Sequence, residues 1–155
     1  MELNQDDFEY LLRLRTGLRR FLRWSEQEAQ AAGLTSAQHQ LLLAIRGHPG
    51  GEPPTIGEIA DYLVLRHHSA GELIDRAEAA GLVVRRPDPL NGTQVRVALT
   101  RTGMVKLKRL TQTHLAELAH LAPTMRALWE ALDANASSAP RSLAVQAPHS
   151  PALTA

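Results

Sequence analysis

The segment from residue 55 to residue 100 constrains the fold most, because its apolar pattern changes there from helical to strand periodicity. Two stretches with apolar residues at helical spacing come first, Ile56–Leu63 and Ala70–Ala77. Two stretches typical of strands follow, Leu82–Arg86 and Val95–Leu99. Helical spacing and alternation each give an element one apolar face. The order helix, helix, hairpin predicts a winged helix-turn-helix.

Capping signals indicate where the helices before this hairpin begin. Thr35 with Gln38, and Thr55 with Glu58, match the capping box, in which both side chains bond to free backbone amides of the first turn. The Pro- and Gly-rich stretch 48–54 between these helices predicts a loop.

The helix that ends near Gly81 has two candidate starts. Ser69 and Glu72 would form another capping box, yet Arg66-His-His68 would equally serve as the first turn. The sequence leaves both starts open.

Long apolar stripes near both ends of the chain predict two further helical regions. The first covers about residues 6–31 and ends near Gly33. The second begins at Thr100 and Gly103. Pro123 suits a first helical position, so a separate final helix is expected to start there. The first helix has more apolar face than a small domain needs, which favours a dimer.

Composition bounds the remaining possibilities. A chain of 155 residues with 44% hydrophobic content supports one domain-sized core. It contains no cysteine, which excludes disulfides and thiolate metal sites on this chain. Its first residues are acidic, and charge interrupts every apolar stretch, so we expect a soluble cytoplasmic protein without a membrane segment. The Ala-, Ser- and Pro-rich residues 136–155 predict a flexible tail.

Positive charge is concentrated in one part of the chain. Residues 66–109 hold nine Lys or Arg and four Asp or Glu, a net charge of +5, whereas residues 1–65 carry −3 and residues 110–155 carry −1. A local basic surface attracts phosphate even when the whole chain is nearly neutral. A merely solvated basic face remains the alternative.

The residues of this segment resemble the MarR family of bacterial transcription regulators. The resemblance is specific over residues 55–103 and extends by element order over about 8–135. It is carried by Ile59-Ala-Asp-Tyr-Leu63, Arg66-His-His-Ser69, Leu73-Ile-Asp-Arg-Ala-Glu-Ala-Ala-Gly-Leu-Val83, Arg86-Pro-Asp-Pro89, Val95, Val97, Leu99-Thr100 and Gly103.

The resemblance implies a mainly α protein with a small β-hairpin that acts as a homodimer. Residues 1–34 and 101–135 would form the helical dimerisation region, and residues 35–100 the winged lobe that binds double-stranded DNA. It further implies a repressor on a pseudo-palindromic operator, released by a small, often aromatic, effector. No cofactor and no enzymatic activity are implied.

In a winged helix-turn-helix, the exposed N-terminal side chains of the second helix read base edges in the major groove. Arg66 is the best candidate for a bidentate contact with guanine. The histidines that follow it would alternatively cap or pack the turn; a metal site is disfavoured, because adjacent histidines point to different sides of a helix. The predicted DNA-binding residues are Thr55, Arg66, His67, His68, Ser69, Arg86, Asn91, Thr93 and Arg96.

Two positions depart from the family pattern. Many members carry an arginine near the wing tip that enters the minor groove, whereas this chain has Asn91-Gly92-Thr93 there. The contact of the wing with the minor groove is therefore expected to be weaker or to come from Arg96. Asn-Gly itself favours a tight hairpin. Glu72 stands where basic or hydroxyl residues are usual. Both departures favour the alternative function, a winged-helix module that binds proteins and not DNA.

The family places an effector pocket between the dimerisation helices and the DNA-binding lobe. Phe21, Trp24, His39 and Leu43 are the expected lining residues. His39 lies within an apolar helix, where a buried structural histidine is the more common role. The sequence contains no catalytic motif and no chelating pair of histidines at i, i+4 spacing.

Overall fold

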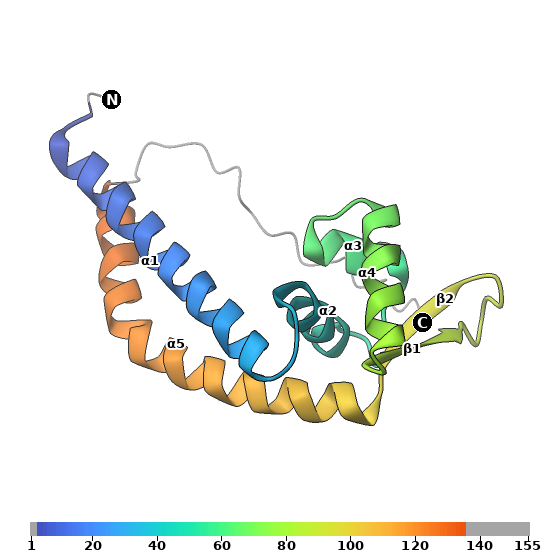
Figure 1. Ribbon diagram of the computed structural model, residues 1–155. Coiled ribbons are helices and arrows are strands. Elements are labelled where there is room, and N and C mark those ends of the chain that lie inside the picture. Colours follow the sequence, from blue (N-terminus) through green and yellow to red (C-terminus); the bar gives the residue numbers. More distant parts are fainter. Residues whose placement is uncertain (1–2, 136–155) are drawn as a thin grey trace. The chain divides into compact units, whose positions relative to one another are not determined.

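The computed structural model describes residues 3–135, apart from the side chains of residues 128 and 131–135. Residues up to His120 form one compact unit, and the part of the last helix from Leu121 onward is grouped separately. Along the described range the elements are α1 (Gln5–Ala31), α2 (Ser36–Gly47), α3 (Ile56–Leu63), α4 (His67–Ala79), β1 (Val83–Pro87), β2 (Val95–Leu99) and α5 (Arg101–Asn135) (Figure 1). The tail expected over residues 136–155 lies outside the described residues.

The capping boxes predicted for α2 and α3 are both present. The side chain of Thr35 accepts from the amide of Gln38, and Thr55 caps α3 through Glu58 in the same way. The start of α4 is now decided between the two candidates: the helix begins at His67, with Arg66 as its N-cap residue. Ser69 therefore lies inside the first turn and does not cap the helix.

The separate final helix expected at Pro123 is wrong. Helix α5 runs from Arg101 to Asn135 with Pro123 inside it. Proline lacks the amide hydrogen that would bond one turn back, so an interior proline costs a helix one hydrogen bond without necessarily ending it. Pro123 is therefore accommodated within one continuous helix.

A left-handed residue makes the turn between α3 and α4. Val64 has φ 53° and ψ 44°, and the amide of Leu65 donates to the carbonyl of Ala60 at 2.9 Å. This backbone conformation is unfavourable for a residue with a side chain, by about 1–2 kcal/mol. The turn therefore depends on the packing of the helices at either side.

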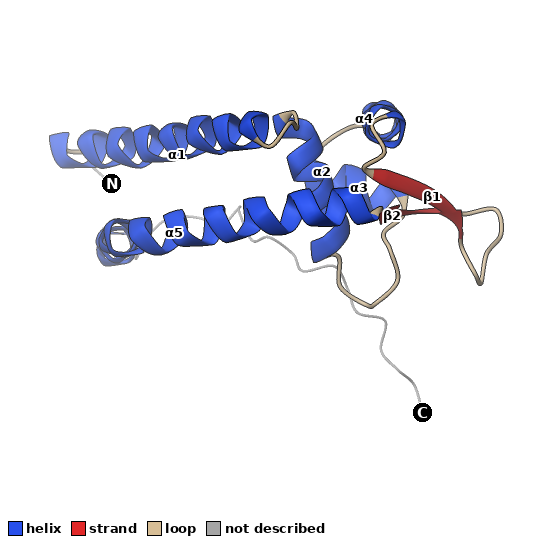
Figure 2. Ribbon diagram, turned by 60° about the horizontal axis from the view of Figure 1, so that its bottom comes forward, coloured by secondary structure: helices blue, strands red, loops and turns tan. Residues whose placement is uncertain are grey.

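The hairpin pairs β1 and β2 in antiparallel register, with Val83 opposite Leu99 and Arg86 opposite Arg96. β1 ends at Pro87 and β2 begins at Val95, so Asn91-Gly92 lies within the connection and does not close the tight hairpin that this pair favours. Residues 88–94 instead form a longer loop. In Figure 2 this wing, which we define as residues 83–99, projects beyond the helices.

The core lies where α2, α3, α4 and the wing meet. Its largest fully buried side chains are Leu41, Leu42, Ile59, Ile74, Val83, Val97 and Pro54. Leu107 and Leu110 of α5 also join this core. Other apolar side chains on α1 and on α5 before residue 121 are largely exposed in the single chain: Phe8, Leu11, Leu12, Leu18, Leu22, Val105, Leu115 and Leu118.

Candidate nucleic-acid interface

The first turn of α4 presents exposed polar side chains. The side chain of Arg66 makes no capping hydrogen bond, and Arg66 and His67 are exposed. Within the described residues neither has an ion-pair partner. Ser69 is half-buried on the same turn. The N-terminal end of α4 therefore offers a free guanidinium and a free imidazole to a ligand outside the chain.

Glu72 is paired within its own helix. Its Oε1 atom lies 3.3 Å from Nε2 of His68, one turn earlier. When His68 is protonated, the two side chains form an ion pair that offsets the negative charge of Glu72. The acidic departure from the family pattern thus has a local partner, and His68 is less available than His67.

Arg85 is paired within the protein, whereas its neighbour Arg86 is free to contact a nucleic acid. Arg85 donates to Glu78 and to Asp75 of α4, each at 2.6 Å. The amide and guanidinium of Arg85 hold the pKa of Glu78 below its usual value. Arg86 is exposed on β1 and has no ion-pair partner among the described residues. Arg85 therefore joins the wing to α4, while Arg86 remains free.

Arg96 is bound at the base of the wing loop. Its Nε atom donates to Asp88, and its Nη1 atom donates to the carbonyl of Pro53 at 2.7 Å. The backbone of Arg96 also pairs with that of Thr55. Sequence reasoning offered Arg96 as a substitute for the missing tip arginine, but two of its guanidinium nitrogens bond within the protein. Its geometry favours holding the wing in place.

Asp88 organises the loop that follows β1. Its side chain is only 3% exposed. Its Oδ1 atom accepts from the amides of Leu90 and Asn91 at 2.7 and 3.0 Å. The Leu90 amide, then Arg96 and the Asn91 amide, hold the pKa of Asp88 below its usual value. The aspartate is ionised at neutral pH and fixes the first half of the wing loop.

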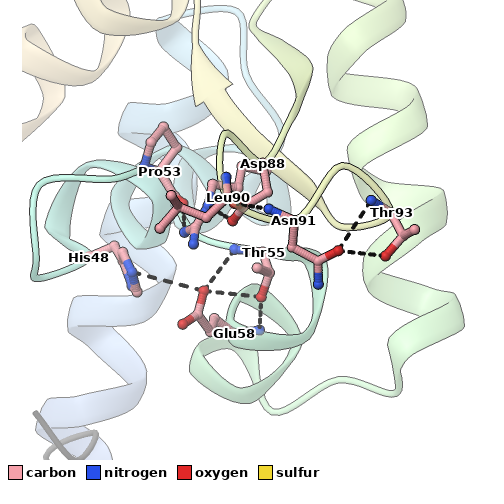
Figure 3. Close-up of polar contacts among 9 residues, drawn as sticks. His48, Pro53, Thr55, Glu58, Asp88, Leu90, Asn91 and Thr93 are labelled. Atoms are coloured by element: carbon pink, nitrogen blue, oxygen red, sulfur yellow. Dashed lines mark hydrogen bonds and ion pairs between the residues drawn. The ribbon is translucent and has the colours of Figure 1, made fainter. Parts of the chain in front are cut away.

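The tip of the wing is held by Asn91 and Thr93. The Oδ1 atom of Asn91 accepts from the amide of Thr93 at 3.3 Å and from its hydroxyl at 2.7 Å (Figure 3). The neighbouring Leu90 is 98% exposed. The tip thus presents the Asn91 amide group and an apolar side chain where the resembling family has an arginine.

Thr55 connects the wing to α3. Its amide and hydroxyl donate to Oε2 of Glu58 at 2.8 and 3.0 Å. Burial alone would raise the pKa of Glu58, but the hydrogen bonds from Thr55 outweigh it and the pKa lies below its usual value. Thr55 is therefore placed beside Arg96, with its polar atoms used inside the protein.

Three of the four expected effector-pocket residues come together. The rings of Trp24 and His39 lie 4.8 and 4.7 Å from the ring of His114 on α5, and Phe21 meets it edge to face at 6.1 Å. Leu43 is not in this cluster; it lies beside α3, among the residues that line a separate hollow. His39 and Leu43 are one helical turn apart on α2, yet His39 is buried and Leu43 is half exposed.

Sequence reasoning missed His114, which lies at the centre of this cluster. Its Nδ1 atom bonds to the carbonyl of Leu110 and its Nε2 atom to the hydroxyl of Ser25, both at 2.7 Å. A carbonyl only accepts, so Nδ1 carries a proton and donates to Leu110. Burial and the nearby His114 lower the pKa of His39. The lowered pKa favours the neutral ring of His39 at neutral pH.

The described part of the chain lacks two further classes of site. No group of three or more His, Asp or Glu residues there is arranged to hold a metal ion. None of the helices described is long and apolar enough to cross a membrane.

A helix-turn-helix followed by a two-stranded wing defines the protein as a winged helix. The model of the MarR family matches residues 32–94. This match covers most of the winged helix-turn-helix lobe, which is thus similar to the MarR family, and solved structures of MarR family regulators share the fold. No curated protein sequence matches it.

Solved structures share the fold over nearly the whole chain. CouR, described as a transcriptional repressor bound to a 23-mer DNA duplex, is 26% identical with a TM-score of 0.64, over 88% of this chain and 99% of its own. A MepR mutant from S. aureus, bound to an oligodeoxyribonucleotide, is 17% identical with a TM-score of 0.61, over 88% and 100%. RV1404 from Mycobacterium tuberculosis is 22% identical with a TM-score of 0.67, over 91% and 98%.

Proposed function

We propose that the protein is a transcription regulator that binds double-stranded DNA as a homodimer. The observation that carries the proposal is the first turn of α4, where Arg66 and His67 are exposed and unpaired among the described residues. A helix fills the major groove, and side chains at its N-terminal end reach base edges. CouR supports this proposal, since it is described as bound to DNA, and the MepR mutant of the same fold is described so as well.

In the proposed complex α4 reads bases and the wing contacts the backbone. Arg86 is the free cation of the wing and would contact phosphate. Arg96 and Thr55 would act mainly by holding the wing against α3, and Asn91 and Thr93 by shaping its tip. The basic charge available to DNA is smaller than the sequence suggests, because Arg85 and Arg96 are paired with carboxylates. Binding is expected to be correspondingly moderate.

The exposed apolar side chains of α1 and α5 support the homodimer. Residues 1–34 and 101–135 would form the dimerisation region, and residues 35–100 the DNA-binding lobe. Large exposed apolar surfaces are costly in a monomer and are buried readily at a symmetric interface. A dimer of winged lobes would match a pseudo-palindromic operator, with each α4 in one half-site.

The regulator would act in the cytoplasm as a ligand-responsive repressor. Binding at a promoter would block transcription, and a small aromatic effector would change the spacing of the lobes. Phe21, Trp24 and His39, together with His114, are the residues proposed to meet this effector. The proposed role requires binding alone, without catalysis or a cofactor.

Selection of genomic fragments by the purified protein, followed by titration at several salt concentrations, tests the DNA-binding proposal. One phosphate contact per protomer, from Arg86, would give a slope of about −2 for log K against log salt. Light scattering on the same sample should give about twice the chain mass of 17.0 kDa. A dimer that selects no fragment and shows no salt-dependent binding would favour a protein-binding module instead.

A further inference from the structure

A hollow of about 360 Å³ lies between α2 and α3, away from the cluster around His114. It is lined by Gln40, Leu43, Ala44 and Gly47 of α2 and by Tyr62 and Leu63 of α3. Leu43 is 50% exposed and Tyr62 is 39% exposed. Water in contact with these apolar surfaces is released when a ligand covers them. The volume lies at the small end of the range for ligand pockets, about 300–1000 Å³.

The lining determines the charge of the ligand that would fit. The lining contains no Asp, Glu, Lys, Arg or His, and most of its side chains are apolar. An ion placed there would lose hydration without gaining a partner of opposite charge. The hollow therefore suits a small, uncharged, mostly apolar molecule.

The polar atoms at the hollow determine the hydrogen-bonding group. The amide nitrogen of Gln40 donates to Ser36 at 3.2 Å, which leaves its carbonyl oxygen to accept. The hydroxyl of Tyr62 lies 2.8 Å from Nδ1 of His48. With neutral His48 bearing its proton on Nε2, Tyr62 donates to Nδ1 and its oxygen can accept a second hydrogen bond. A ligand with one hydroxyl or N–H donor would meet acceptors on both helices.

A continuous series of polar contacts leads from Tyr62 to the wing. His48 bonds to Tyr62, and its Nε2 atom lies 3.9 Å from Oε2 of Glu58. The same Glu58 atom accepts from Thr55, whose backbone pairs with Arg96. Figure 3 shows Glu58 joined to His48 on one side and to Thr55 on the other, below the wing loop. These contacts connect the Tyr62 hydroxyl to the base of the wing, and the His48–Glu58 step of 3.9 Å is the longest of them.

We propose that the hollow between α2 and α3 binds a small uncharged apolar molecule carrying one hydrogen-bond donor, and that its occupancy is communicated to the wing through Tyr62 and His48. The binding step is independent of the proposed DNA-binding function. Only the effect that a shifted wing has on DNA rests on that function.

A titration of the ¹⁵N-labelled full chain with cyclohexanol, followed by amide chemical shifts, tests the proposal. Amides of the lining residues should shift with half-saturation at about 1 mM, the range for a ligand of this size. Smaller shifts should appear in the wing at residues 88–96. Cyclohexanone has the same ring without a donor and should bind about 3- to 10-fold more weakly, the factor for one hydrogen bond. Cyclohexylammonium, which is charged, should not bind.

Two variants examine the two halves of the proposal. Gly47→Leu should abolish binding by filling the hollow; a Cβ there meets no atom within 4 Å, so the fold should be retained. Tyr62→Phe keeps the ring, so at saturation the lining amides should still shift while the wing amides do not. It should also reduce the preference for cyclohexanol over cyclohexanone, leaving only the part that the Gln40 carbonyl supplies. Leu90→Ala, an exposed leucine truncated outside the hollow, should leave binding at the lining residues unchanged.

The opposite results overturn the proposal. If no lining amide shifts, or if the shifts persist in Gly47→Leu, the hollow is not the site. If the lining amides shift without the wing in the parent protein, the communication through His48 is wrong. None of these outcomes involves DNA, so each is distinguishable from a failure of the proposed DNA-binding function.

Discussion

Arg96 donates a hydrogen bond from its Nε atom to Asp88, and this pair closes the base of the wing loop. The same carboxylate accepts from the amides of Leu90 and Asn91. The Asp88 side chain therefore holds both Arg96 of β2 and the first half of the wing loop. An ionised acceptor shared by three donors holds a loop more firmly than neutral contacts do. The wing is therefore ordered from within, before any nucleic acid is present.

Replacing Asp88 by Ala should loosen the wing loop without unfolding the lobe. The amides of Leu90 and Asn91 lose their acceptor and should exchange with solvent faster, by about 3- to 10-fold for one hydrogen bond each. Hydrogen exchange followed by NMR measures this directly. Asp75→Ala serves as the matched control, because Asp75 pairs with Arg85 and not with the loop. Equal exchange rates in Asp88→Ala and the parent would contradict the proposed role of the carboxylate.

Gly103 marks a close approach between α5 and the end of the turn after α4. A Cβ atom at Gly103 would lie 2.2 Å from the carbonyl oxygen of Leu82, a backbone atom that also accepts from the amide of Thr100. Gly103→Ala should therefore lower the free energy of unfolding by about 1–3 kcal/mol, as overpacking does.

Gly71 provides the matched control for that substitution. It lies inside α4, and a Cβ there meets no atom within 4 Å. Gly71→Ala should raise the free energy of unfolding by about 0.5–1 kcal/mol through helix propensity. Urea unfolding of both variants gives the comparison. Two changes of the same sign would show that the close approach to Leu82 is not limiting.

The stability of the protein should fall when the pH drops below about 6.5, through His39. Burial and His114 lower the pKa of His39 from its ordinary value of 6.5 in the folded state. Between 6.5 and the lowered pKa the unfolded chain binds a proton that the folded chain does not, so acid favours unfolding. The stabilisation is complete above 6.5, and below that value it is lost progressively until the pH falls past the folded pKa.

Thermal unfolding at about pH 7.5 and about pH 5.5 measures this effect. His39→Phe keeps a ring of similar shape but cannot titrate, so its melting temperature should decrease less between the two pH values. His67→Phe is the control, because His67 is exposed and unpaired among the described residues. An identical decrease in the parent and in His39→Phe would assign the acid sensitivity to other groups.

Local signals in the sequence were sufficient for the helix starts and for the order of the elements. The capping boxes at Thr35 and Thr55 need only residues three positions apart, and both are present. Pro123 shows the limit of such signals, because a proline suits a helix start yet also occurs within a longer helix.

The arrangement of the candidate site depended on contacts between distant residues. His114 joins Trp24 and His39 only because α5 packs beside α1 and α2 in the compact unit. Arg96 bonds to Pro53, which is 43 positions earlier in the chain. A sequence gives the charges of Arg85 and Arg96 but not their partners, so the number of basic residues overstates the charge left for DNA.

The strongest prediction about DNA separates a residue that specifies sequence from one that contributes affinity. Arg66→Ala should cost about 1–3 kcal/mol per half-site on a selected operator, because it removes a bidentate hydrogen bond to a base, while nonspecific binding falls much less. Arg86→Ala should weaken all duplexes alike and reduce the salt slope by about one unit for each phosphate that it no longer neutralises. Anisotropy titrations of operator and scrambled duplexes over a salt series separate the two effects. Arg13→Ala on α1, whose side chain pairs with Glu9, is the control and should change neither quantity. If Arg66→Ala binds the operator as tightly as the parent at every salt concentration, then α4 does not read the groove and a protein-binding role becomes the better explanation.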